Sequence, residues 1–167
     1  NTVTVSVIPA TTPGAPPSVI VDPPTAYTPV INTAVTTLEP IPDPVRVTRN
    51  WMERGNTISV SGSVGLNWRT RREALSVWKP ELYAGTVFSE LLRKNGVATT
   101  GCVLPDSSST ALPPLFVFER RIDTILTFMN KVSDNLAAEA MLKSIAARKA
   151  GTPGSAHAGI QLVRQFL

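Results

Sequence analysis

Cysteine and histidine are almost missing from this sequence, and their scarcity excludes several kinds of site. The 167 residues include one cysteine, Cys102, and one histidine, His157. One cysteine rules out an intrachain disulfide and a multi-cysteine zinc site, and one histidine rules out a histidine-rich metal site. The apolar neighbour Val103 indicates that Cys102 is a small buried thiol. His157, near a helix start, is expected to be partly exposed without a special role. We expect no metal and no cofactor.

Long apolar runs and a start signal are missing as well. No stretch approaches the roughly 20 apolar residues that cross a bilayer, so no transmembrane segment is expected in this chain. The sequence has neither an initiator methionine nor a signal-peptide pattern at its start, where residues 1–5 (NTVTV) have the pattern of a strand interior. We therefore expect an internal fragment of a longer protein.

Charge is sparse and mildly positive. Charged residues make up 17% of the chain and hydrophobic residues 43%, with a net charge of +4, which is a globular composition. The only tight group of cations is Arg69, Arg71 and Arg72, and no aromatic residues that could stack on bases alternate with it. The arginines are better explained as a solvated face or a match to an anionic surface. Nucleic acid is not an expected partner.

Proline and valine dominate the first part of the chain, which has the pattern of short strands. Ten of the fifteen prolines lie within residues 1–50, and Val3, Val5 and Val7 alternate with polar residues. A period of two turns one apolar face inward, so a strand is predicted here. Further strands are predicted around residues 45–47, 57–61, 75–77 and 102–104, with a turn at 54–56.

A helical pattern begins at Pro80. Proline suits the first helical position and Asn95-Gly96 is a typical stop, so a helix is predicted over residues 80–94. Its expected buried stripe is Leu82, Val87 and Leu91. A polar loop over residues 105–110 is predicted to follow.

The last third is predicted to be a strand and three helices. The apolar run at residues 115–118 is typical of a strand covered on both faces. Four apolar residues then repeat at i, i+3, i+4 and i+7, which predicts a helix; they are Ile122, Ile125, Leu126 and Met129. Residues 136–149 and 157–167 predict two more helices, with Ser155 capping the last.

Ser133-Asp134-Asn135 lies between the first two of these helices. All three residue types are preferred at helix starts, so a simple cap is one interpretation of the motif. Ser-Asp-Asn at a turn between two buried helices is also the second of three motifs in penicillin-recognising enzymes. The surrounding sequence bears on the choice between these two interpretations.

The wider sequence resembles one family. Residues 129–139 (MNKVSDNLAAE) are similar to the D-alanyl-D-alanine carboxypeptidases of the low-molecular-weight class C penicillin-binding proteins. Further segments resemble that family's inserted accessory region and the helix leading back to its peptidase domain; they are residues 3–5, 22–24, 30–32, 49–62 and 80–97. The resemblance covers essentially the whole chain. It departs at residues 119–121 (ERR), where the family has a histidine and a Ser-Pro pair.

The resemblance implies an α+β architecture in two parts. Residues 1–109 would form β-rich accessory (inserted) subdomains with one helix near residues 80–95. Residues 110–167 would be a mainly α-helical fragment of a penicillin-binding/serine β-lactamase-like domain. The parent protein would be a serine-type D-Ala-D-Ala carboxypeptidase or endopeptidase that cleaves peptidoglycan stem peptides through an acyl-enzyme. It would work outside the cytoplasm, in the periplasm or at the cell envelope, with β-lactams as covalent inhibitors.

The resemblance also assigns roles within the motif. Ser133 and Asn135 would be catalytic, with Ser133 relaying a proton to the leaving D-alanine and Asn135 binding the substrate peptide through its amide. Asp134 would brace the turn. Lys131 could orient the motif, although a surface cation is the better interpretation. The Ser-x-x-Lys nucleophile and the Lys-Thr-Gly motif would lie outside this chain, which alone is expected to be inactive.

Two other segments imitate these missing motifs. Ser76 and Lys79 have Ser-x-x-Lys spacing, but a residue before Pro80 is disfavoured in helical geometry and a strand pattern runs into Ser76. Residues 149–151 (KAG) resemble Lys-Thr-Gly, but they end an alanine-rich helix, where lysine and glycine are ordinary stop residues. Neither segment is predicted to be catalytic.

Two rival functions follow from other interpretations of the motif. A β-lactamase also carries Ser-Asp-Asn, but class A enzymes lack a long β-rich insertion before it. In a non-catalytic wall-binding or assembly module, the first 109 residues would do the work and Ser133 would be only a cap.

Overall fold

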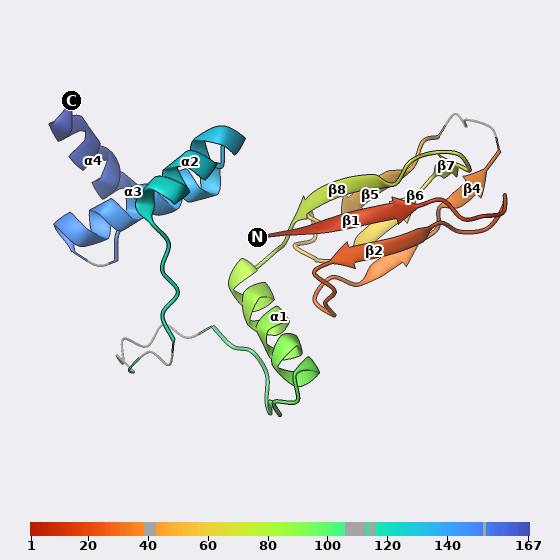
Figure 1. Ribbon diagram of the computed structural model, residues 1–167, viewed down its shortest axis with the longest axis horizontal. Helices are drawn as coiled ribbons and strands as arrows, with labels where there is room; N and C mark the ends of the chain where they lie inside the picture. Colours follow the sequence, from red (N-terminus) through yellow and green to blue (C-terminus); the bar gives the residue numbers. More distant parts are fainter. Residues whose placement is uncertain (39–42, 106–112, 114–115, 152) are drawn as a thin grey trace. The chain divides into compact units, whose positions relative to one another are not determined.

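The computed structural model describes residues 1–38, 43–105, 113, 116–151 and 153–167. The chain divides into two compact units, Asn1–Ser108 and Ser109–Leu167. In the described residues the first unit contains the strands and one helix, and the second contains three helices (Figure 1). This mixed architecture confirms the predicted α+β class. No helix in the described ranges is long and apolar enough to cross a membrane.

The strands of the first unit are short and form three small sheets. Their bounds are β1 (Thr2–Ile8), β2 (Ser18–Asp22), β3 (Val30–Asn32), β4 (Val35–Thr37), β5 (Arg46–Arg49), β6 (Ile58–Ser61), β7 (Ser63–Gly65) and β8 (Arg71–Ser76). The sheet orders are β2-β1-β8, β3-β6-β5 and β4-β7. The first sheet is antiparallel throughout, whereas β3 with β6 and β4 with β7 are parallel pairs.

Strand β1 is the centre of the first sheet, between β2 and β8 (Figure 1). Val3, Val5 and Val7 are buried and alternate with less buried neighbours, as the sequence pattern predicts. Full burial of one valine side chain contributes roughly 1.5–3 kcal/mol, so this stripe is a substantial part of the core.

Gly62 separates β6 from β7 and lets the chain pass from one sheet to the next. Its φ is +86°, in the left-handed region, and a Cβ there would lie 2.8 Å from the carbonyl oxygen of Pro44. Only glycine satisfies both conditions without strain. Val60 in β6 and Val64 in β7, each two residues from Gly62, are both fully buried.

Helix α1 (Pro80–Lys94) begins and ends where the sequence predicts, but it buries a different face. Tyr83 is in the core cluster and Val87 packs against it, whereas Leu91 is 51% exposed and Leu82 is only half-buried. The predicted stripe of Leu82, Val87 and Leu91 is therefore wrong except at Val87. The Tyr83 hydroxyl donates to the carbonyl of Thr2, which attaches the helix to β1.

The strand predicted around residues 102–104 is absent, and Cys102 is exposed. Residues 99–103 instead pack alongside α1. The Thr99 and Ser89 hydroxyls are hydrogen-bonded at 3.0 Å, and Val103 lies against Gly85. The expectation of a buried thiol is therefore wrong. The polar loop predicted for residues 105–110 lies outside the described residues, apart from Pro105.

The second unit contains helices α2 (Ile122–Val132), α3 (Asn135–Ala150) and α4 (Ala156–Phe166), close to the predicted ranges. Ser155 caps α4 by accepting a hydrogen bond from the Ala158 N–H, as predicted. Gly159 brings α4 against α3, since a Cβ there would lie 2.6 Å from the Leu142 carbonyl oxygen.

The apolar run before α2 is not a covered strand. Residues 116–118 have no strand assignment, and Phe116 is 81% exposed; Leu115 lies outside the described residues. A strand needs a hydrogen-bonded partner, and no second strand is present in the described part of this unit. Phe118 instead lies under the guanidinium of Arg120, 5.2 Å from the ring centroid.

Candidate functional site

Ser133, Asp134 and Asn135 form the tight turn between α2 and α3. Ser133 ends α2 in the left-handed conformation, with φ 53° and ψ 48°. Its N–H and that of Asp134 both donate to the carbonyl of Met129. One carbonyl therefore closes the helix end and fixes the backbone of the motif.

Asp134 is the N-cap of α3. Its Oδ1 accepts a hydrogen bond of 3.0 Å from the Ala137 N–H, and its backbone carbonyl accepts one from Ala138. The side-chain bond satisfies an N–H that a helix start leaves without a partner, and the backbone bond is the first regular bond of the helix. The carboxylate is therefore engaged in holding the turn.

Ser133 and Asn135 present their side chains together. Both line an open hollow of about 260 Å³, whose other lining residues are Met129, Asn130, Asp134 and Ala138. Both residues are exposed, and neither the Ser133 hydroxyl nor the Asn135 amide has a hydrogen-bond partner in the described part of the chain. The Ser133 hydroxyl and the Asn135 amide, with the amide of Asn130 also in the lining, can together donate and accept hydrogen bonds at a peptide.

Lys131 and the two segments that imitate the missing motifs do not contribute to the lining of this hollow. Lys131 is exposed near the end of α2 and does not line it. Ser76 ends β8 and Lys79 has a φ of +52°, so this pair is not on a helical turn. Lys149 and Gly151 lie at the end of α3, not on a strand.

His157 is not among the residues that line the hollow. His157 is exposed in the first turn of α4, as expected. Within the described residues no group of three or more histidine, cysteine or acidic side chains could hold a metal ion.

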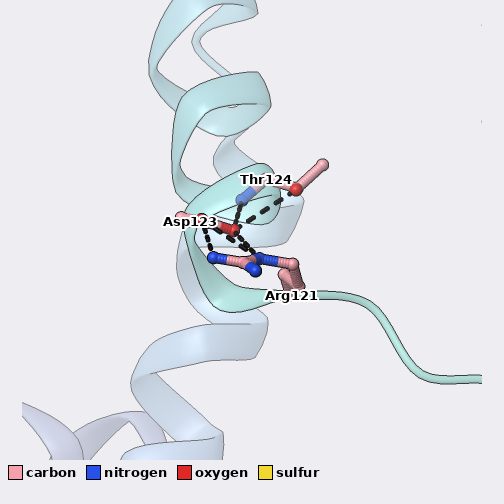
Figure 2. A network of polar contacts seen from close by, with 3 residues as sticks. All are labelled: Arg121, Asp123 and Thr124. Atoms are coloured by element: carbon pink, nitrogen blue, oxygen red, sulfur yellow. Dashed lines mark hydrogen bonds and ion pairs between the residues drawn. The ribbon is translucent and has the colours of Figure 1, made fainter.

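The start of α2 carries a polar network that the sequence analysis missed (Figure 2). The Arg121 guanidinium forms an ion pair of 2.8 Å with Asp123, whose Oδ1 also accepts from the Thr124 N–H at 2.7 Å. Arg121 holds the pKa of the Asp123 carboxyl below its usual value, and the pKa of Arg121 is raised in turn. The sequence feature that could have indicated this network is Asp123, an acidic residue in the first turn of a predicted helix. Arg121 is the last residue of the segment that departs from the family pattern.

Comparison with known families gives a match over the whole chain. The sequence profile of the D-Ala-D-Ala carboxypeptidase 3 (S13) family matches residues 1–167, so the chain belongs to this family. The resemblance seen in the sequence is therefore confirmed. No curated protein sequence matches the chain.

Two solved structures share the fold. One is penicillin binding protein 4 (dacB) from Haemophilus influenzae in complex with a novel β-lactam, with a TM-score of 0.71 and 20% identity. The other is penicillin binding protein 4 (dacB) from the same organism, with a TM-score of 0.74 and 19% identity. Each match covers 99% of this chain but only 38% and 36%, respectively, of the solved chain.

Proposed function

We propose that this chain is part of a serine-type D-Ala-D-Ala carboxypeptidase or endopeptidase that acts on peptidoglycan stem peptides. The observation that carries the proposal is the shared hollow of Ser133 and Asn135, in a chain that belongs to the S13 family along its whole length. Family membership favours this function over a β-lactamase or a purely structural module. Residues 1–109 would be the accessory region and residues 110–167 part of the peptidase domain.

The proposed reaction uses a serine nucleophile from a Ser-x-x-Lys motif outside this chain. That serine attacks the carbonyl carbon of the D-Ala-D-Ala bond, and the bond to the departing nitrogen breaks. The proton that the attacking serine loses passes to Ser133 as Ser133 gives its own proton to this nitrogen, so Ser133 ends neutral and D-alanine leaves as a neutral amine. Water then attacks the acyl ester, releasing the shortened peptide and the free serine.

The other motif residues position these groups. The Asn135 side chain would donate its N–H₂ to a substrate carbonyl and accept from a substrate N–H, which fixes the peptide in the attack geometry. Asp134 holds the turn through its bond to the Ala137 amide. Lys131 would act only indirectly, through the charge that it adds near the motif.

The partners follow from this chemistry. Peptidoglycan peptides would be substrates, and β-lactams would acylate the nucleophile of the parent protein as covalent inhibitors. Because the peptidoglycan lies outside the cytoplasmic membrane, the parent would work in the periplasm or at the cell envelope.

Labelling with a fluorescent penicillin tests the proposal in the parent protein. We expect the parent to form a covalent adduct and the 167-residue chain alone to form none. Ser133→Ala and Asn135→Ala should each slow adduct formation by about 100-fold or more, in line with the loss of a proton-transfer or orienting group. Lys131→Ala is the matched surface control and should change the rate less than threefold. Normal labelling of the Ser133→Ala and Asn135→Ala variants, or an adduct on the isolated chain, would contradict the proposal.

A further inference from the structure

The outer face of sheet β3-β6-β5 carries an open hollow of about 470 Å³. Its floor includes Ile31, Ser59 and Thr48, which are direct cross-strand partners in register. The neighbours of Ser59 on β6, Ile58 and Val60, are fully buried in the core. Because side chains alternate between the two faces of a strand, the floor residues point away from the core.

Trp51 stands at the edge of this hollow and of a second one. The second hollow, of about 280 Å³, is lined by Val47, Thr48, Arg49, Trp51, Leu75 and Ser76. Trp51 is 65% exposed, although a tryptophan side chain is costly to leave in water. One exposed indole between two hollows fits an elongated ligand better than a compact one.

The connection that carries Trp51 is held in place by hydrogen bonds. The Arg49 guanidinium donates to the Gly55 carbonyl at 2.7 Å. The Asn56 side chain accepts from the Trp78 N–H at 2.7 Å and donates to the Trp78 carbonyl at 3.1 Å. An ordered connection loses little conformational entropy when a ligand binds, so Trp51 is prepared for binding.

The lining of the larger hollow indicates an uncharged ligand with many hydroxyl groups. Thr48, Thr57 and Ser59 line it, and none of their hydroxyls has a hydrogen-bond partner among the described residues. No carboxylate lines it, and its one cation, Arg49, already donates to Gly55. Hydroxyls that both donate and accept match the hydroxyls of a sugar, and an indole face matches the C–H face of a sugar ring.

A peptide strand is a poorer fit to this surface. Peptides add to a sheet through the main-chain groups of its edge, and their side chains occupy separate pockets. The hollow here opens on the face of the sheet, where the polar lining groups are side chains, mainly hydroxyls together with Arg49 and Asn50.

We infer that Trp51 and the outer face of β3-β6-β5 bind a saccharide chain of N-acetylated amino sugars. The indole stacks on one sugar ring, while Thr48 and Ser59 bond to hydroxyls of the sugars beside it. The choice of amino sugars rests on the proposed function, because peptidoglycan stem peptides are attached to such chains. The accessory region would then hold the glycan whose peptides the parent protein cleaves.

Titration of the 167-residue chain with chitotetraose, the tetramer of N-acetylglucosamine, tests this inference. Indole and amide NMR signals of Trp51, Thr48 and Ser59 should shift saturably. Trp51→Ala should weaken binding by roughly tenfold or more, as expected for a central aromatic contact. Trp68→Ala removes another exposed tryptophan of the same unit and is the matched control, with unchanged affinity expected. Far-UV circular dichroism should be the same for both variants.

Several outcomes would overturn the inference. These are no saturable shift, equal weakening by Trp51→Ala and Trp68→Ala, equal affinity for cellotetraose, or a dimer in sedimentation that Trp51→Ala abolishes. Penicillin labelling of the parent is a separate readout of the proposed peptidase function. A parent that fails to label would refute the proposed peptidase function, while the chitotetraose titration would still decide whether the sugar site exists.

Discussion

The carboxylate of Asp134 accepts a hydrogen bond from the Ala137 N–H at 3.0 Å, directly after Ser133 has ended the preceding helix. Asp134→Ala should therefore lower the stability of the helical unit by about 1 kcal/mol, the usual effect of losing a cap. Asp134→Asn keeps an accepting oxygen and should stay within a few tenths of a kcal/mol of the original. Denaturant unfolding followed by circular dichroism at the helix signal measures both. Equal losses in the two variants would mean that the cap is not the stabilising element.

A glycine at position 133 should affect stability and activity differently. The φ of Ser133, 53°, is unfavourable for a residue with a side chain. Ser133→Gly should keep or raise the stability of the 167-residue chain, by up to about 1 kcal/mol. In the parent protein the same change should slow penicillin labelling as much as Ser133→Ala, because both remove the hydroxyl. Thermal unfolding and labelling rates measure the two effects. Labelling that survives in Ser133→Gly would show that the hydroxyl has no role.

Asn56 should be more sensitive to truncation than Asn50. Its side chain makes two hydrogen bonds to the backbone of Trp78, so Asn56→Ala should cost about 1–3 kcal/mol. Asn50→Ala removes only an exposed side-chain bond to Glu53 and should cost less than about 0.5 kcal/mol. Denaturant unfolding followed by tryptophan fluorescence measures the difference. Similar midpoints for the two variants would contradict this assignment.

Two glycines within helices should respond differently to alanine. At Gly159 the new Cβ would lie 2.6 Å from the backbone oxygen of Leu142, so α4 must move away from α3. At Gly85 the close neighbour is one methyl of Val103, which can rotate, and alanine also improves helix propensity. Gly159→Ala should cost about 1–3 kcal/mol and Gly85→Ala should be nearly neutral, as measured by thermal unfolding. The opposite order would mean that the helix contact in the second unit is looser than its geometry indicates.

The Arg121–Asp123 pair predicts a pH effect at the start of α2. Since Arg121 lowers the pKa of Asp123 in the folded chain, the ionised carboxylate favours folding. This contribution is complete above the unfolded pKa of about 3.9 and is lost as the pH falls through the lower folded value. Carboxyl NMR titration should place the Asp123 pKa below the usual value, and Arg121→Ala should raise it towards that value, with the Thr124 N–H still holding it down. Titration at the usual value in the original chain would contradict the prediction.

Local patterns in the sequence predicted the elements whose ends and faces are set locally. The alternation of Val3, Val5 and Val7 gave β1, and the proline start with the Asn95-Gly96 stop gave both ends of α1. In each case the residues that determine the element lie within a few positions of it, so the element could be predicted without knowledge of any distant contact. The position of Ser133 between two helices was predicted for the same reason.

Features that depend on distant partners were not predictable. The run at residues 116–118 has strand composition, but a strand forms only where another offers its backbone, and composition carries no information on that. The buried face of α1 is chosen by its contacts with β1, which favour Tyr83 over Leu91. The proposed role of Trp51 depends on the pairing of β5 with β6, which places Thr48 and Ser59 in the same hollow as the indole.

The central place of β1 has a consequence for how the chain is made. Its partner β2 follows after a few residues, but the partner on the other side, β8, ends only at Ser76. During synthesis, the valines of β1 can therefore pair only with β2 until the chain has been made as far as Ser76. Pairing over such a separation is slow, so this sheet should close late and control the folding rate of the first unit. Until then the open side of β1 is a surface on which a chaperone or a second nascent chain could dock.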